Sequence, residues 1–244
     1  MTLQKTITRK RDLAPILADV QAVYMSGGAA TVANWLRNHL LCHRVKFPLL
    51  EHTAVQLATF IPQPEQQTLI NNLVGLPEHG SSVIIGKLLQ LWLPHSLPEA
   101  FQLAEIAITK GDAWYHCDHI GERVFGYALR HQFEEALPLL THLLQDGNDW
   151  LQRAVGVAAH YATKKGLPAA EVETVLALLM TQVHSSAYEV QRGVGWGLKT
   201  IAKFHPDLMQ RELAKLPPGA IAAPIRRKIE TGLATAAKKR VSVG

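Results

Sequence analysis

An aromatic residue occupies the third position of three similar segments, which lie at nearly equal spacing along the chain. The segments read D-A-W-Y-H-C-D, N-D-W-L-Q-R-A and S-A-Y-E-V-Q-R, so Trp114, Trp150 and Tyr188 lie 36 and 38 residues apart. A period in this range is typical of helical repeat proteins, in which each helix pair packs only against its neighbours. The spacing therefore favours a stack of helix pairs, in which residues one repeat apart become neighbours in space.

The remaining sequence shows one helical pattern after another. Apolar residues recur at helical spacing, strand-like alternation is missing over any useful length, and glycines and prolines separate the segments. Helices are expected over 13–25, 29–42, 47–60, 65–73, 82–93, 99–109, 112–130, 133–145, 150–163, 169–184, 188–204, 206–216 and 222–237. The prediction is an all-α chain, an α-solenoid of HEAT-like helical repeats with a concave groove, forming a single domain over 1–244. A compact helical bundle is the alternative, but it would not require the repetition.

Several helix ends carry local signals. Gly111 and Gly166 each follow a basic last turn, and glycine suits the left-handed position just after a helix. Asn148 or Asp149 can cap the helix that begins near Trp150, because a short polar side chain accepts hydrogen bonds from the first free backbone N–H groups.

The composition indicates a folded, cytoplasmic protein. The 244 residues are 48% hydrophobic, which is enough for a sizeable core. No apolar run approaches the roughly 20 residues that a membrane helix needs, and no apolar signal segment follows the N-terminus. The two cysteines, Cys42 and Cys117, fit a reducing compartment and are expected to be buried thiols.

Positive charge gathers at both ends of the chain. The net charge is +5, and basic residues cluster in 5–11 and in 226–240, where Arg226 and Arg227 lie. Residues 1–12 and 238–244 are expected to be frayed basic ends. Two interpretations remain open for these charges: solvated chain ends, or a surface that binds a polyanion.

Trp114 and Asp118 are the leading candidates for chemistry. Four residues apart on a helix, they share one face, so an indole ring and a carboxylate point the same way. A carboxylate beside aromatic rings can stabilise a developing cation or orient a water molecule. The alternative is a structural aspartate that pairs with Arg123 or Arg153.

Arg153 and Trp196 are further candidates on later helices. Arg153 lies in the otherwise apolar W-L-Q-R-A-V-G-V, where a guanidinium needs a phosphate or an acidic partner. Trp196 lies in R-G-V-G-W-G-L-K, and three glycines inside a helix are tolerated where another backbone comes close. A neighbouring helix is the favoured source of that backbone, and a nucleic-acid strand is the alternative.

The sequence gives little support for metal or cofactor chemistry. His116 and His119 could share an ion, but a third ligand is not evident, and the chain has no His-Glu pair of the kind that HEAT-type di-iron hydroxylases use. Phosphate-binding, dinucleotide-binding, serine-hydrolase and zinc-protease motifs are also missing from the sequence. We expect neither a metal nor a cofactor.

At these residues the chain resembles the AlkD-type DNA alkylation-repair glycosylases, which are built from HEAT-like repeats. The resemblance rests on the W-x-x-x-D pair Trp114 and Asp118, the arginine of W-L-Q-R-A and the tryptophan of G-W-G-L-K, and it spans about residues 103–204. The chain departs from the family pattern at Tyr115, His116 and Cys117, and at Lys199, where the family often has an arginine.

The resemblance implies a monomeric glycosylase that acts on double-stranded DNA containing alkylated purines. Asp118 would stabilise the sugar cation left by a positively charged N3- or N7-alkylpurine, and Trp114 and Trp196 would contact the cationic nucleotide. Arg153 would bind substrate, and the cations Lys199, Arg192, Arg226 and Arg227 would hold the DNA. The alternative is a non-catalytic HEAT-like module that binds damaged or branched DNA, or a protein partner.

Overall fold

The computed structural model describes residues 5–241, and the side chains among them up to residue 238. The chain is all-α, as predicted, apart from two strands of two residues each. The elements are β1 (Thr6–Ile7), α1 (Lys10–Leu36), the π-helix η1 (Arg37–Leu41), β2 (Arg44–Val45), α2 (Phe47–Phe60), α3 (Gln63–Val74), α4 (Gly80–Trp92), α5 (Leu97–Gly111), α6 (Trp114–Ile120), the π-helix η2 (Gly121–Gly126), α7 (Tyr127–His131), α8 (Phe133–Gln145), α9 (Asp149–Lys164), α10 (Ala169–Met180), α11 (Tyr188–Phe204), α12 (Pro206–Ala214) and α13 (Ala223–Val241).

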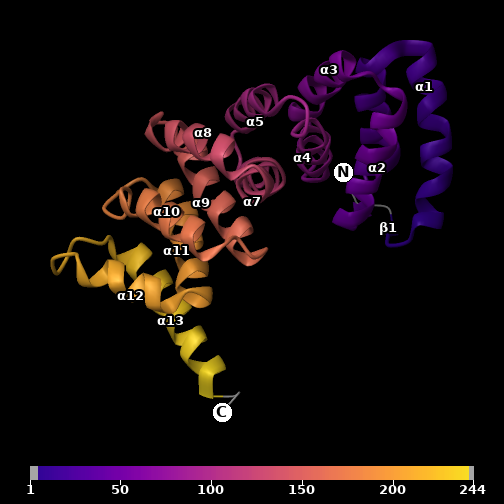
Figure 1. Ribbon diagram of the computed structural model, residues 1–244. Coiled ribbons are helices and arrows are strands. Elements are labelled where there is room, and N and C mark those ends of the chain that lie inside the picture. Colours follow the sequence, from indigo (N-terminus) through magenta and orange to yellow (C-terminus); the bar gives the residue numbers. More distant parts are fainter. Residues whose placement is uncertain (1–4, 242–244) are drawn as a thin grey trace. The chain divides into compact units, whose positions relative to one another are not determined.

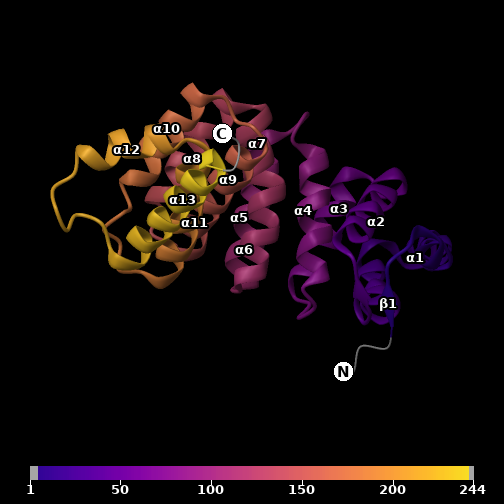
Figure 2. The same ribbon diagram turned by 90° about the horizontal axis from the view of Figure 1, so that it is seen from below.

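The described helices form two compact units, divided between Val124 and Phe125. The single domain over 1–244 stays a prediction. In the first unit α4 packs against α2, α3, α5 and α6 (Figures 1 and 2). In the second, α11 lies between α9 and α13, with α8, α10 and α12 packed alongside (Figure 1). Each unit therefore consists of helices packed in succession along the chain.

Side-chain contacts confirm the repeat period. Ser82 and His119 hydrogen-bond across 37 residues, and Arg153 pairs with Glu189 across 36. Lys228 donates to a backbone carbonyl 36 residues earlier. Residues one repeat apart are thus neighbours within each unit, as the spacing of the aromatic residues predicts.

Glycines bring the backbones of α9 and α11 together. A Cβ added at Gly156 would lie 2.1 Å from the carbonyl carbon of Gly193, and one added at Gly193 would lie 2.3 Å from the backbone oxygen of Arg153. Gly197 faces the backbone oxygen of Gly156 in the same way. Gly193 and Gly197 are therefore explained by the backbone of a neighbouring helix, the favoured alternative, while a Cβ at Gly195 would meet the side chain of Lys228 on α13.

Most predicted helix ends are found, with one correction. Asn148 caps α9 by accepting from the N–H groups of Trp150 and Leu151, and Gly166 has a φ of 85°. Gly28 (φ 70°) breaks α1 where the sequence predicts a stop. At the end of α5, however, Asp112 and not Gly111 takes the left-handed position. Gly111 is needed for space instead, because a Cβ there would lie 2.5 Å from the ring of His116.

The expected single helix over 112–130 is also corrected. It is divided into α6, η2 and α7, with the π-helical stretch at 121–126. Each extra residue in a π-helical turn rotates the following residues around the axis, and such stretches often occur at functional sites. Trp114 and Asp118 both precede it, so their shared face on α6 is kept.

The N-terminal end is ordered where fraying was expected. In the described part of 1–12, Thr6–Ile7 pairs in parallel with Arg44–Val45, and α1 begins at Lys10. Ile7 is buried, so this end is anchored by an apolar side chain. At the C-terminus α13 continues to Val241. Residues 1–4 and 242–244 of the expected frayed ends lie outside the described residues.

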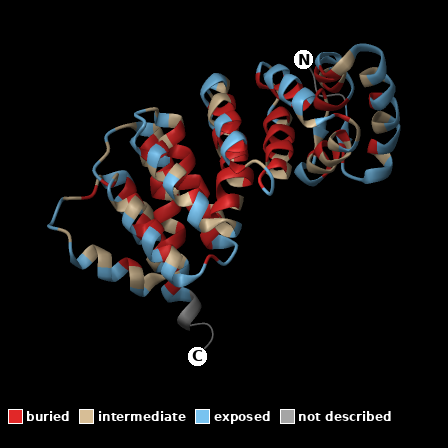
Figure 3. Cartoon of the chain, turned by 45° about the horizontal axis from the view of Figure 1, so that its top comes forward, coloured by how far each residue is buried: buried red, intermediate tan, exposed pale blue. Residues whose placement is uncertain are grey.

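The core of each unit consists of apolar side chains on facing sides of the helices. Figure 3 shows buried residues along the sides that meet neighbouring helices and exposed residues on the outer sides. Cys42 and Cys117 are buried free thiols. In the part of the chain that the structure describes, no helix has both the length and the hydropathy of a membrane span.

The helix contact at Gly156 can be tested with Gly156→Ala. We expect a loss of about 2 kcal/mol or more of unfolding free energy, since the added methyl group meets backbone that cannot rotate away. Gly75→Ala is the control, because Gly75 has a φ of −73° and its nearest relevant atom is 3.8 Å away. Urea unfolding measures both variants; equal, small changes would contradict the close approach.

Candidate functional site

Trp114 belongs to a cluster of rings on the first unit, which we call the Trp114 cluster: Phe47, His79, Trp114, Tyr115 and His119. The ring of His79 stacks on Tyr115 at 4.0 Å and meets Trp114 edge-on at 5.5 Å. The centroid of the His119 ring lies 4.7 Å from that of the Phe47 ring and 6.4 Å from that of the Trp114 ring. Trp114 is 49% exposed and Phe47 44%, so the cluster presents aromatic surface to solvent.

The histidines beneath this surface are held neutral. Burial lowers the pKa of His119 to about 4, and the charge of Arg123 acts in the same direction. Burial, followed by the charge of His79, lowers the pKa of His116 to about 4 as well. Ser82 donates its hydroxyl proton to the backbone oxygen of His79, so it accepts from Nδ1–H of His119. The imidazole of His119 therefore carries its proton on Nδ1.

Asp118 is half-buried and lies one helical turn after Trp114 on α6. A seven-residue helix places residues four apart on one face, so the predicted pairing of indole and carboxylate fits the observed helix. Arg123, one of the two arginines weighed as a partner for Asp118, donates from Nε and Nη2 to Glu51 at 3.0 and 2.7 Å.

Trp196 belongs to a second group on the other unit, the Trp196 cluster: His160, Trp196, Thr200 and the lysines Lys164, Lys199 and Lys203. The rings of Trp196 and His160 stack at 4.1 Å. Thr200 donates to the backbone oxygen of Trp196 and so accepts from Nδ1–H of His160 at 2.7 Å. These bonds fix the imidazole against the indole of Trp196, which is half-exposed.

The three lysines make this cluster positive. Burial lowers the pKa of His160 to about 4, and the charges of Lys164, Lys199 and Lys203 contribute in that order. Nearby, the guanidinium of Arg192 lies 5.9 Å from the exposed ring of Tyr188. Arg226 and Arg227 are exposed on α13. Cations thus lie on α9, α11 and α13, and the exposed ring of Tyr188 lies on α11.

Arg153 is 7% exposed and is held by its surroundings. Its Nη1 donates to Glu189 Oε2 at 2.5 Å, and its guanidinium lies 5.9 Å from the ring of Trp150. The sequence left two kinds of partner open for Arg153, a phosphate or an acidic residue. The structure shows the acidic residue, because Arg153 forms an ion pair with Glu189. The pair joins α9 to α11 beside the glycine contact.

The sequence matches the family of DNA alkylation repair enzymes over residues 16–237. The chain is a member of that family. Comparison with curated proteins finds no match.

Solved structures share the fold of this DNA alkylation repair family member. The crystal structure of AlkD2 from Streptococcus mutans has a TM-score of 0.68 at 14% identity, covering 84% of this chain and 97% of that one. The structure of smu.31 from Streptococcus mutans UA159 has a TM-score of 0.61 at 15% identity, covering 76% and 90%. At these identities the likeness concerns the helical-repeat fold.

The predicted site residues of this family member fall into two pairs. Trp114 and Asp118 lie on α6 in the first unit, while Arg153 and Trp196 lie on α9 and α11 in the second. Convergence of all four remains a prediction. Lys199 and Arg192 share α11 with Trp196, and Arg226 and Arg227 lie on α13.

Sequence reasoning missed several neighbours of these residues. Phe47 and His79 join the Trp114 cluster from α2 and from the loop before α4, and His160 supports Trp196 from α9. The repeat period was a usable signal, because His79 and Tyr115 lie one repeat apart, as do His160 and Trp196. Among the described residues, no group of three or more potential ligands could hold a metal ion.

The neutral histidines predict acid sensitivity. Between pH about 6.5 and 4 the unfolded chain binds protons at His116, His119 and His160 that the folded chain excludes, so stability falls as pH falls. In His160→Asn the loss of unfolding free energy between pH 7 and pH 5 should be smaller than in the parent by about 2 kcal/mol. The exposed His184→Asn is the control and should behave as the parent. Urea unfolding at both pH values measures the difference; an unchanged loss in His160→Asn would contradict the buried neutral ring.

Proposed function

We propose that this protein is a monomeric DNA glycosylase that hydrolyses the N-glycosidic bond of positively charged N3- and N7-alkylpurines. Membership of the DNA alkylation repair enzyme family supports repair of alkylated DNA as its role. The observation that carries the finer proposal is the pairing on α6 of an exposed indole, Trp114, with the carboxylate of Asp118 one turn later.

The chemistry needs few protein groups. Alkylation at N3 or N7 places a positive charge on the purine and weakens its bond to the sugar, so the base leaves without a separate general acid. The sugar left behind resembles an oxocarbenium ion, which the Asp118 carboxylate stabilises while it positions a water molecule. Trp114 contacts the cationic nucleotide through its ring face. Neither step requires a cofactor.

The uncharged state of the neighbouring imidazoles suits this role. His116 and His119 have pKa values near 4, so at neutral pH they add no positive charge beside the proposed cation site. A protonated imidazole there would repel a cationic purine and would compete with it for Asp118. Trp114 therefore lies beside the neutral ring of His119 and shares α6 with one carboxylate, Asp118.

The second unit supplies the surface proposed to bind the DNA backbone. Lys164, Lys199 and Lys203 gather around Trp196, and Arg192, Arg226 and Arg227 extend the positive charge over α11 and α13. Phosphate contacts of this kind position a duplex without reading its sequence. Trp196 provides a ring held in place by its stack on His160, the residue on which the charges of the three lysines act.

Arg153 has a more restricted role in the proposal than the exposed cations. Its ion pair with Glu189 neutralises part of its charge, and a phosphate would compete with that carboxylate. Arg153 contributes to substrate binding in two ways. It holds α9 against α11, which fixes the position of Trp196. It also offers the DNA the part of its positive charge that Glu189 does not neutralise.

Asp118→Asn tests the catalytic proposal. Release of 7-methylguanine or 3-methyladenine from methylated duplex should fall at least about 100-fold, because the amide keeps the shape but loses the charge that stabilises the sugar cation. DNA affinity should stay within a few-fold. Asp19→Asn, an exposed aspartate on α1, is the matched control. Full activity in Asp118→Asn would remove the assigned role.

Salt dependence tests the proposed DNA surface. The double variant Lys199→Gln, Lys203→Gln should reduce the slope of log affinity against log salt by up to about 2, since each lost phosphate contact removes about 0.9. Lys215→Gln is the control, because Lys215 pairs with Glu212 on α12. Fluorescence anisotropy with a duplex gives both slopes, and an identical slope in all three proteins would contradict this surface.

The second candidate function is binding without excision. The exposed cations and rings of the second unit would serve a non-catalytic module for damaged or branched DNA equally well. If the parent protein binds DNA but releases no base from methylated duplex, the non-catalytic function is favoured.

A further inference from the structure

One face of the short strand pair in the first unit carries four exposed polar side chains, which we call the strand surface: Thr6, Thr8, Arg44 and Lys46. Thr6 pairs with Arg44, and Ile7 pairs with Val45. Side chains alternate between the two faces of a strand, so Arg44 lies on the face opposite the buried Ile7. Lys46 has an extended backbone, and its N–H donates to the oxygen of Ile7 at 3.2 Å, so the alternation continues through Lys46.

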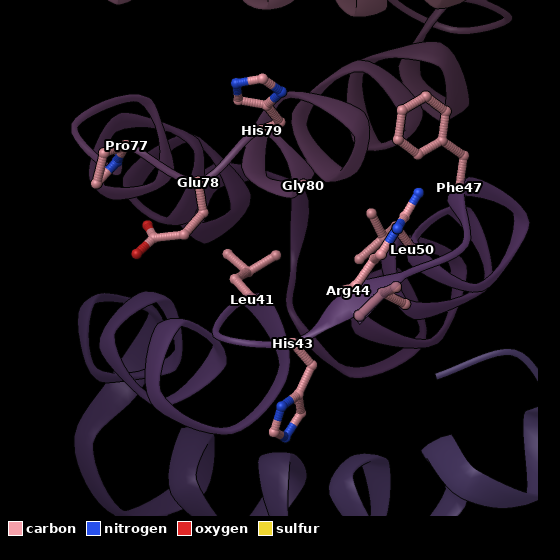
Figure 4. Close-up of a pocket in the computed structure, with 10 residues that line it drawn as sticks. Leu41, His43, Arg44, Phe47, Leu50, Pro77, Glu78, His79 and Gly80 are labelled. Carbon is pink, nitrogen blue, oxygen red and sulfur yellow. The ribbon is translucent and has the colours of Figure 1, made fainter. Parts of the chain in front are cut away.

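The positive charge of the strand surface is not neutralised by the acids around it. Within the part of the chain that the structure describes, neither Arg44 nor Lys46 takes part in an ion pair. Glu78 lines the same pocket of about 420 Å³ as Arg44, but it pairs with Arg37 at 3.2 Å. Figure 4 shows the carboxylate of Glu78 on the opposite side of this pocket from the side chain of Arg44.

The N-terminal segment brings further cations to this place and holds them on ordered backbone. Lys5 and Arg9 flank the strand β1 and are exposed, and residues 5–11 contain no acidic side chain. The N–H of Arg44 donates to the oxygen of Lys5 at 2.9 Å, and Ile7 anchors the segment in the core. Binding through an ordered segment loses less conformational freedom than binding through a frayed end. Of the two interpretations that the sequence left open for this end, the order favours a polyanion-binding surface.

Phe47 connects the strand surface to the Trp114 cluster. It follows Lys46 directly in the chain, and its exposed ring meets the ring of His119 at 4.7 Å. Arg44 and Phe47 both line the pocket, and in Figure 4 the side chain of Arg44 extends toward Phe47. The cations therefore lie beside the cluster whose indole, Trp114, the proposed function assigns to the damaged nucleotide.

We propose that the strand surface binds the phosphate backbone of duplex DNA. Arg44 and Lys46 contact phosphates, and the hydroxyls of Thr6 and Thr8 donate to phosphate oxygens. Guanidinium, ammonium and hydroxyl groups are the donors that position a protein on a duplex without reading its sequence. The inference rests on the proposed function, because the polyanion is then the duplex that carries the damaged nucleotide. It adds phosphate contacts on the first unit to those proposed for the second.

The double variant Arg44→Gln, Lys46→Gln tests the strand surface with undamaged duplex. Its affinity at about 0.1 M salt should fall about tenfold or more, and the slope of log affinity against log salt should decrease by up to about 2, because each lost phosphate contact removes about 0.9. Lys110→Gln, at an exposed lysine in the last turn of α5, is the control and should bind as the parent. Fluorescence anisotropy gives affinities and slopes; parental values in the double variant would overturn the proposal.

A variant that keeps both charges separates phosphate binding from a role in shaping the strand pair. Arg44→Lys, Lys46→Arg should retain the parental slope, with an affinity within a few-fold of the parent. A decrease in slope as large as that of the glutamine variant would contradict the proposed contacts. Thermal unfolding of each variant reports whether it is folded.

A membrane surface is the other polyanion that exposed cations could bind. Vesicles of phosphatidylcholine and phosphatidylserine in equal parts test it in a sedimentation assay, at the salt concentration used for the duplex. The parent should bind the duplex and not these vesicles. Vesicle binding that Arg44→Gln, Lys46→Gln abolishes, together with unchanged affinity for the duplex, would overturn the proposal.

Failure of the strand surface and failure of the proposed function are distinguishable. If the parent releases 7-methylguanine from methylated duplex, and Arg44→Gln, Lys46→Gln binds DNA with parental affinity and slope, the glycosylase stays and the strand surface is removed. If the parent binds duplex through Arg44 and Lys46 but releases no base, the strand surface stays and the glycosylase assignment is removed.

Discussion

The close approach of α9 and α11 is the constraint on which the second unit depends. Glycines at 156, 193 and 197 let the two backbones touch, and a side chain at any of these positions would force them apart. The contact sets the register of the two helices. In that register Arg153 reaches Glu189, and His160 stacks on Trp196 and binds Thr200. The positions of Trp196 and the lysines around it thus follow from glycines that carry no chemistry themselves.

The first unit uses the same repeat spacing with different chemistry. Ser82 fixes the ring of His119 from a position 37 residues away, and His79 stacks on Tyr115. Burial keeps His116 and His119 neutral, and the uncharged ring of His119 meets the exposed rings of Trp114 and Phe47. Under the proposed function, a cationic base would meet Trp114 and the Asp118 carboxylate there, and the cations that this function assigns to the DNA backbone lie on the second unit.

Much of this organisation could be predicted from the sequence, because the repeat period and the helical spacing are local signals. The bounds of α2, α8 and α11 agree with the predicted ranges, and the glycines around Trp196 indicated a close helix. Phe47 could not be identified, since its importance depends on its contact with His119 in space. The π-helix η2 and the left-handed backbone conformation of Asp112 were not predicted either, because they depend on packing and not on residue preference. Convergence of Trp114, Asp118, Arg153 and Trp196 stays a prediction.

The proposed chemistry depends on the positive charge of the damaged base, because that charge both loosens the glycosidic bond and attracts the base to aromatic rings and a carboxylate. The most direct measurement compares base release by the parent protein from two duplexes of one sequence, one carrying 7-methylguanine and the other carrying uracil, a neutral lesion. Release of 7-methylguanine with no release of uracil is the predicted result. Release of both at similar rates, or of neither, would contradict it.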